Sequence, residues 1–150
     1  MTAPRRLPLV AGTAAAVVVL DQLTKEWALR ALVDGPVHLF WTLRLNLSIN
    51  SGVAFGLGRG SGPIIVVLGV LVLAVILVAT RKAELTTWTG AAAGLVVGGA
   101  VGNLVDRVFR GHGGVVDFID FQWWPIFNVA DAAISVGAVL LILKAKDEPA

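Results

Sequence analysis

The sequence predicts an all-α membrane protein with four transmembrane helices and a small extracytoplasmic β-sheet or loop segment. Of its 150 residues, 57% are hydrophobic and only 15% are charged, whereas a soluble domain carries about 25% charged residues. Four apolar stretches approach the roughly 20 residues that a helix needs to cross a bilayer. Between the first two stretches lies an alternating apolar and polar segment, which is typical of a strand.

The expected spans cover residues 7–27, 61–80, 86–106 and 126–144. The second span is free of charge, the third is free of charge up to Asp106, and the fourth is interrupted only by Asp131 before it ends at Lys144. We expect a single domain over residues 1–150, because a chain of this length rarely forms more than one.

Four spans place both termini on the same side of the membrane. Each face holds six Lys or Arg residues, but those of the termini and of the 80–87 loop are denser, so the positive-inside rule predicts cytoplasmic termini. The first span has an alternative interpretation as a secretory signal peptide, since Arg5 and Arg6 precede its apolar run. No small-residue cleavage site follows that run, which argues against this alternative.

Two local patterns refine the fold. Residues 37–49 alternate between apolar and polar side chains, which predicts a strand that can pair with the β-rich segment 115–121. On the third span, glycine recurs at every fourth position from Gly90 to Gly102, a spacing typical of closely packed helices. The next step of that stripe is Asp106, so we expect its carboxylate to face the helix bundle.

The composition excludes several classes of site and partner. There are no cysteines and only two histidines, and the net charge of +2 is spread along the chain. A thiolate nucleophile is therefore excluded, and we expect no metal, no other cofactor and no nucleic-acid partner.

Polar side chains occur at a similar depth in three of the predicted spans. Asp21, Asn103 and Asp131 each lie about 20–22 Å along the helix from the inner boundary, at 1.5 Å per residue. A lone charge at such a depth costs roughly 2.5–3.5 kcal/mol, so these groups either pair or mark a functional site. Asp21 and Lys25 are four residues apart, a spacing that suits an ion pair.

Two carboxylates that are brought together with little water share a proton. The ionised member can then activate water while the protonated member polarises a carbonyl, which is the requirement of aspartyl peptide hydrolysis. Spacing alone does not select the pair, and a proton pathway is a second possibility. The candidates are Asp21, Asp106, Asp117, Asp120 and Asp131.

Five segments carry a family resemblance. In chain order they are DQLTK at 21–25, NSGVAFG at 50–56, GGAVGNLVDR at 98–107, VVDFIDF at 115–121 and FNVAD at 127–131. Together they resemble the motifs of bacterial lipoprotein signal peptidase (signal peptidase II). The link between the last two segments looks shorter than in many members of that family, which puts substrate contacts of this loop in doubt.

The resemblance implies a monomeric aspartic endopeptidase of the bacterial inner membrane, with its active site at the extracytoplasmic face. It implies that membrane lipid and lipid-modified prolipoproteins are the partners, and that cleavage occurs before a diacylglyceryl-modified cysteine. Asp117 and Asp131 would form the catalytic pair. Residues with a substrate-binding or supporting role would be Asn50, Asn103, Asp106, Arg107, Asn128, Asp21 and Lys25.

Simpler interpretations exist for these residues. Asp117 and Asp131 could be structural carboxylates, Asp106 and Arg107 a structural ion pair, and Asp120 a solvated neighbour. At the level of the whole protein, the alternatives are a four-span transporter and a non-catalytic assembly subunit. A transporter would place its carboxylates near mid-membrane, and only a peptidase would release a signal peptide.

Overall fold

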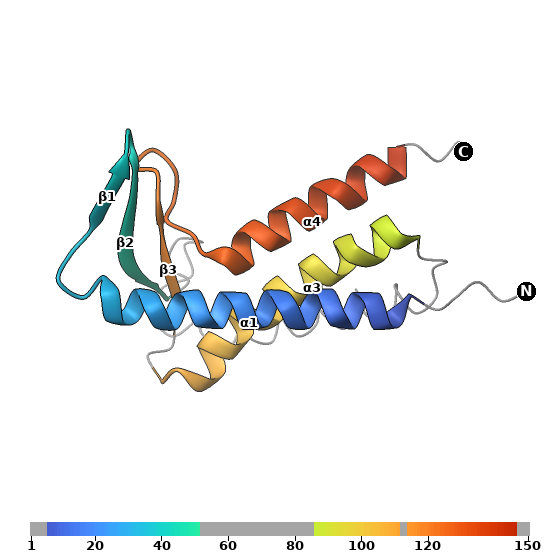
Figure 1. Cartoon of the computed structure of the whole chain (residues 1–150), viewed down its shortest axis with the longest axis horizontal. Helices are drawn as coiled ribbons and strands as arrows, with labels where there is room; N and C mark the ends of the chain where they lie inside the picture. The colour runs from blue at the N-terminus through green and yellow to red at the C-terminus, as the bar shows by residue number, and fades with distance from the viewer. Residues whose placement is uncertain (1–5, 52–85, 112–113, 147–150) are drawn as a thin grey trace, which may run out of the picture.

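The computed structural model describes residues 6–51, 86–111 and 114–146. Three helices lie alongside one another, and a three-stranded sheet sits at one end of them (Figure 1). The starts of α1 and α3 and the end of α4 lie at the opposite end of the molecule (Figure 1). The elements, in chain order, are α1 (Leu7–Ala31), β1 (Val37–Phe40), β2 (Leu43–Asn50), α3 (Thr87–Phe109), β3 (Val115–Asp120) and α4 (Val129–Lys146).

Two of the described helices, α1 and α3, are long and apolar enough to cross a membrane. Both extend beyond the predicted ends at residues 27 and 106. In contrast, α4 begins later than predicted, at Val129, because Phe127 is paired with Ile119 of the sheet. The predicted span 61–80 lies outside the described residues.

The glycine stripe of α3 forms a close helix contact, as predicted, and the helix it packs against is α1. A Cβ atom added to Gly98 would lie 2.7 Å from the Ala14 carbonyl oxygen, and one added to Gly94 would lie 2.6 Å from Cβ of Thr13. An adjacent face of α3 approaches α4, where a Cβ on Gly99 would collide with the Ala130 carbonyl. Glycine therefore lets α3 contact both neighbouring helices at backbone distance.

The sheet has the order β1-β2-β3 with antiparallel neighbours. The predicted pairing of the two β segments is confirmed, with Ser48 opposite Asp117. The prediction of one strand over residues 37–49 is wrong, because a turn at Trp41 and Thr42 divides it into a hairpin. Trp41 has a φ of 47°, a left-handed conformation that alternation of side chains does not reveal.

A small apolar core joins the sheet to the end of α1. Ala28 of α1 and Leu32, the C-cap of that helix, pack against Phe118 of β3, and the Trp27 ring meets the Phe118 ring edge-on at 6.4 Å. Because neighbouring residues of a strand point to opposite faces, burial of Phe118 on this side fixes the direction in which Asp117 points.

Candidate active site

Asp117 is a buried carboxylate on β3, with only 2% of its surface exposed. Its Oδ2 accepts a hydrogen bond from Asn50 Nδ2 at 3.0 Å, and its Oδ1 accepts one from Asn128 Nδ2 at 2.7 Å. The charged groups facing it are Asp131 of α4, Lys25 of α1 and Arg107 of α3. Burial raises the pKa of Asp117 to about 6; the Asn50 hydrogen bond opposes this rise, and the negative charge of Asp131 adds to it.

Asp131 is positioned by the cap of α4. The Asp131 backbone N–H donates to Asn128 Oδ1 at 2.9 Å, and the Asn128 backbone N–H donates to Asp131 Oδ2 at 3.3 Å. This reciprocal pattern is a capping box, with Asn128 as the N-cap and Asp131 at the third helical position. The cap places Asp131 in the first turn of the helix, where the helix dipole stabilises a negative charge.

Two asparagines bridge the two carboxylates. Asn103 Nδ2 donates to Asp131 Oδ1 at 2.7 Å, and Asn103 Oδ1 accepts from Asn128 Nδ2 at 3.1 Å. The same Asn128 nitrogen bonds Asp117. The structure therefore brings both predicted catalytic residues, together with Asn50, Asn103 and Asn128, into one hydrogen-bond network.

A buried charge cluster centred on Lys25 lies next to this network. The fully buried Lys25 ammonium contacts Asp21 Oδ2 at 2.7 Å and Asp106 Oδ2 at 2.9 Å, which confirms the predicted pairing of Asp21 with Lys25. Asp21 also accepts the Ala130 N–H at the start of α4, and Asp106 accepts the Val116 N–H of β3. The cluster thus ties α1 and α3 to the two elements that carry Asp117 and Asp131.

The predicted ion pair between Asp106 and Arg107 is replaced by other partners. Arg110, four residues after Asp106, contacts it at 2.9 Å, and Lys25 is its second cation. Arg107 instead donates to the Asn103 carbonyl oxygen at 3.3 Å. Arg110 was missed, although its helical spacing from Asp106 signals a pair.

The interpretation of Asp120 as a solvated neighbour is wrong, because it is 2% exposed. Arg44 of β2 contacts it at 2.7 Å. Burial acts to raise the pKa of Asp120, but hydrogen bonds from Arg44, the Gln122 N–H and Asn46 lower it below its usual value. Asp120 therefore belongs to a separate ion pair on the same strand as Asp117, and this pairing depends on a strand register that the sequence does not display.

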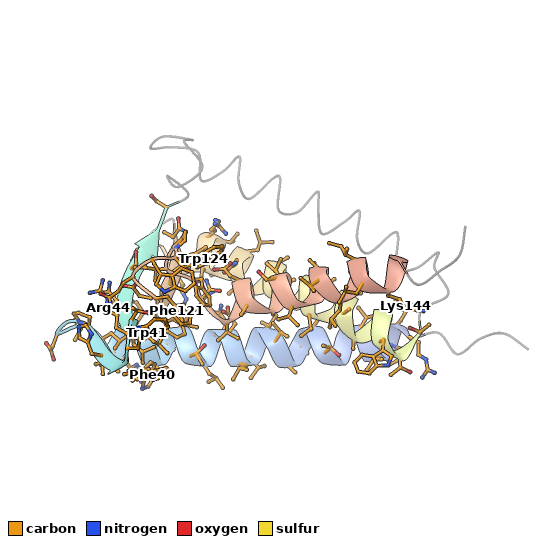
Figure 2. The ribbon with its side chains drawn as sticks, turned by 90° about the horizontal axis from the view of Figure 1, so that it is seen from above. Phe40, Trp41, Arg44, Phe121, Trp124 and Lys144 are labelled. Atoms are coloured by element: carbon orange, nitrogen blue, oxygen red, sulfur yellow. The ribbon has the colours of Figure 1, made fainter. Side chains whose placement is uncertain are left out.

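Aromatic residues gather beside the sheet. Phe121, Trp123, Trp124 and Phe127 line a wide-open apolar depression of about 300 Å³. Figure 2 shows Phe121 and Trp124 at the same end of the molecule as Phe40 and Trp41, with Lys144 at the other end. Trp123 and Trp124 are both exposed. Within the described ranges, no group of three or more His, Cys, Asp or Glu side chains could hold a metal ion.

Comparisons with known proteins agree with this arrangement. A family model described as signal peptidase (SPase) II matches residues 13–146. A lipoprotein signal peptidase of Mycobacterium leprae is 40% identical over 149 residues, covering 95% of this chain and 74% of the relative. Another, from Syntrophomonas wolfei, is 36% identical over 140 residues, covering 88% and 89%. A solved bacterial membrane enzyme superposes with a TM-score of 0.83 at 26% identity, over 93% of this chain and 94% of the other.

These matches argue against the transporter and the assembly-subunit hypotheses, since the matching family is one of proteases. They cover almost the whole chain, including every segment on which the resemblance was based. The chain belongs to the signal peptidase II family, whose members are membrane proteases that process lipoproteins.

Proposed function

We propose that this protein is an aspartic endopeptidase that removes the signal peptide from prolipoproteins by cleaving before a diacylglyceryl-modified cysteine. The observation that carries the proposal is the shared contact of Asp117 and Asp131 with Asn128. The Asn128 side chain bonds the Asp117 carboxylate and the Asn128 backbone N–H bonds the Asp131 carboxylate, so one residue holds two carboxylates from different elements. Asn103 makes a second link to Asp131.

In the proposed reaction, the two carboxylates take different roles. Asp131, at the positive end of the α4 dipole, is ionised and removes a proton from water as the water oxygen attacks the substrate carbonyl carbon. Asp117 carries a proton and donates a hydrogen bond to the carbonyl oxygen. The peptide C–N bond then breaks, and the departing amine takes the proton that Asp131 had accepted. A pKa of about 6 for Asp117 lies near neutrality, where a catalytic acid is efficient.

Asn50, Asn103 and Asn128 orient the carboxylates in this scheme. Asp21, Lys25 and Asp106 support the elements on which they lie, and Arg107 is available for substrate contact beside Asn103. These residues act without a metal or cofactor in the proposed chemistry.

We further propose that the chain is one domain of four spans in the bacterial inner membrane, with cytoplasmic termini and the site at the extracytoplasmic face. Both α1 and α3 run toward the sheet (Figure 1), so the chain must return between them, and a second span at 61–80 provides this return. Exposed Trp123 and Trp124 lie near the sheet, and exposed Trp88 begins α3 at the other end. Such an arrangement suits two interfacial belts in contact with membrane lipid. We expect the monomer to be active.

The test uses Asp117→Asn and Asp131→Asn in the purified full-length protein. The substrate is a synthetic prolipoprotein peptide whose cysteine carries diacylglycerol, and the same peptide with a free cysteine is the comparison. Asp120→Asn is the matched control, since Asp120 lies on the same strand but pairs with Arg44. We expect the first two variants to lose cleavage and the control to keep it. Cleavage by either variant at the wild-type rate would refute the aspartate pair, and equal cleavage of both peptides would refute the lipid requirement.

A further inference from the structure

The ammonium group of Lys25 has a third partner besides its two carboxylates. Lys25 Nζ donates to Asn103 Oδ1 at 3.0 Å, in addition to Asp21 at 2.7 Å and Asp106 at 2.9 Å. An ammonium group has three N–H donors, so each donor of this fully buried side chain has its own acceptor. The direction of the Lys25 donor toward Asn103 is therefore fixed.

The Asn103 amide has two ends of nearly equal shape, and hydrogen bonds alone decide which end points where. Its oxygen accepts from Lys25 and from Asn128, while its nitrogen donates to Asp131 Oδ1 at 2.7 Å. Rotating the amide by half a turn would place its NH₂ group against the ammonium and its oxygen against the carboxylate. Both new contacts would be repulsive, so Lys25 and Asp131 favour the same orientation from opposite sides.

We propose that Lys25 is a positioning residue of the reaction: by holding the Asn103 oxygen, it keeps an amide N–H directed at Asp131. This inference rests on the proposed function, in which Asp131 activates water. Asp131 then receives a side-chain donor on Oδ1 and the Asn128 backbone donor on Oδ2. The carboxylate is held between them, with its remaining lone pairs available to water.

A purely structural role for Lys25 is the alternative, because its carboxylate partners also join α4 and β3 to the bundle. The two roles differ in what they do to turnover. A structural role acts on folding, whereas a positioning role acts on kcat of the folded protein through Asn103.

The chain offers a matched control. Lys25→Met and Arg110→Met each remove one of the two cations of Asp106, but the bonds of Arg110 run to Asp106, Glu26 and Gln22 rather than to Asn103. We expect Lys25→Met to lower kcat by about tenfold to hundredfold with KM nearly unchanged, the range for one lost hydrogen bond to a charged group. Arg110→Met should lower the melting temperature and keep kcat within about twofold at temperatures where it is folded.

A double-mutant cycle gives the readout that a structural role would not produce. If Lys25 acts through the Asn103 amide, then Lys25→Met should add no further loss of kcat in an Asn103→Leu background. Losses that multiply, or wild-type kcat in folded Lys25→Met, would overturn the inference.

Asn103→Asp tests the same point if Lys25→Met does not fold, since loss of Lys25 leaves two buried carboxylates without their shared cation. This variant preserves an oxygen for Lys25 but replaces the donor to Asp131 with an acceptor. We expect a folded protein whose kcat is reduced at least about tenfold, and unchanged kcat would refute the inference. Cleavage by Asp131→Asn would instead refute the proposed function itself, so the two failures are distinguishable.

Discussion

Replacing Asn128 with aspartate separates its two roles in the site. The Asn128 oxygen caps α4 through the Asp131 N–H, and its nitrogen bonds Asp117 Oδ1 at 2.7 Å. Aspartate is as good an N-cap as asparagine, so Asn128→Asp retains the cap. The bridge to Asp117 is lost, because a carboxylate oxygen now faces another carboxylate in a fully buried position.

Two magnitudes decide how the variant responds. Two negative charges 2.7 Å apart repel by roughly 6 kcal/mol at an effective dielectric constant of about 20. Protonating an aspartate of ordinary pKa at pH 7 costs only about 4 kcal/mol. The pair will therefore take up a proton, which lies between Asp117 and the new side chain and no longer faces the substrate. Since a positioned general acid contributes about 10²-fold or more, kcat should fall by at least about a hundredfold.

Stability and turnover of Asn128→Asp are measured by thermal unfolding between pH 5 and 8 and by cleavage of the lipidated peptide. The folded variant binds a proton that the unfolded chain releases, so its stability deficit relative to wild type should grow as pH rises. Asn46→Asp is the control, because Asn46 donates to Asp120 at 3.1 Å and Arg44 lies beside that carboxylate. Asn46→Asp should keep wild-type kcat. Wild-type kcat in folded Asn128→Asp would refute the proposed role of the Asn128–Asp117 hydrogen bond. A stability deficit that does not change with pH would refute it as well.

Three further predictions follow from the described contacts. If Asp117 supplies its proton to the reaction, kcat/KM should decline as pH rises above about 6, the pKa of that carboxyl; a flat pH–rate profile from pH 5 to 8 would contradict this role. Because the pKa of Asp120 is lowered in the folded state, its pairing stabilises the protein above the unfolded pKa and is lost as pH falls through the folded one. Arg44→Gln should therefore flatten the melting temperature between pH 3 and 6, and an unchanged slope would show that the pair does not contribute. Gly98→Val should prevent folding, as its Cβ would lie 2.7 Å from an α1 carbonyl. Gly12→Ala should leave the melting temperature unchanged or raise it, since no atom in the described part of the chain lies within 4 Å of the added Cβ.

The sequence predicted the described helices well because their signals are local. Apolar length defined α1 and α3, and the four-residue glycine period identified the α3 face that packs on α1. The sheet was predicted less well, since alternation continues through the left-handed turn at Trp41. A side-chain period reports which residues could share a face, but the reversal of the chain depends on one backbone dihedral.

The site shows the same division between local and distant information. The Asp21–Lys25 pair was predicted from its helical offset, whereas the capping box of Asn128 and Asp131 emerges only from the structure. Contacts between distant segments were not visible in this way. Asp120 was taken for a solvated residue because its partner, Arg44, is 76 residues away, and Asp117 was selected through family resemblance alone.

The capping box explains why this sequence can hold an aspartate pair at a helix start. An N-cap asparagine normally satisfies a backbone N–H and leaves its amide nitrogen for other partners. Here that nitrogen is directed at Asp117, so the residue that starts α4 also joins the helix to β3. A serine or threonine at position 128 could cap the helix but has no second end to reach Asp117. The geometry of the site therefore requires an amide at this position: its oxygen caps α4 locally, and its nitrogen reaches Asp117 only where α4 docks against the sheet.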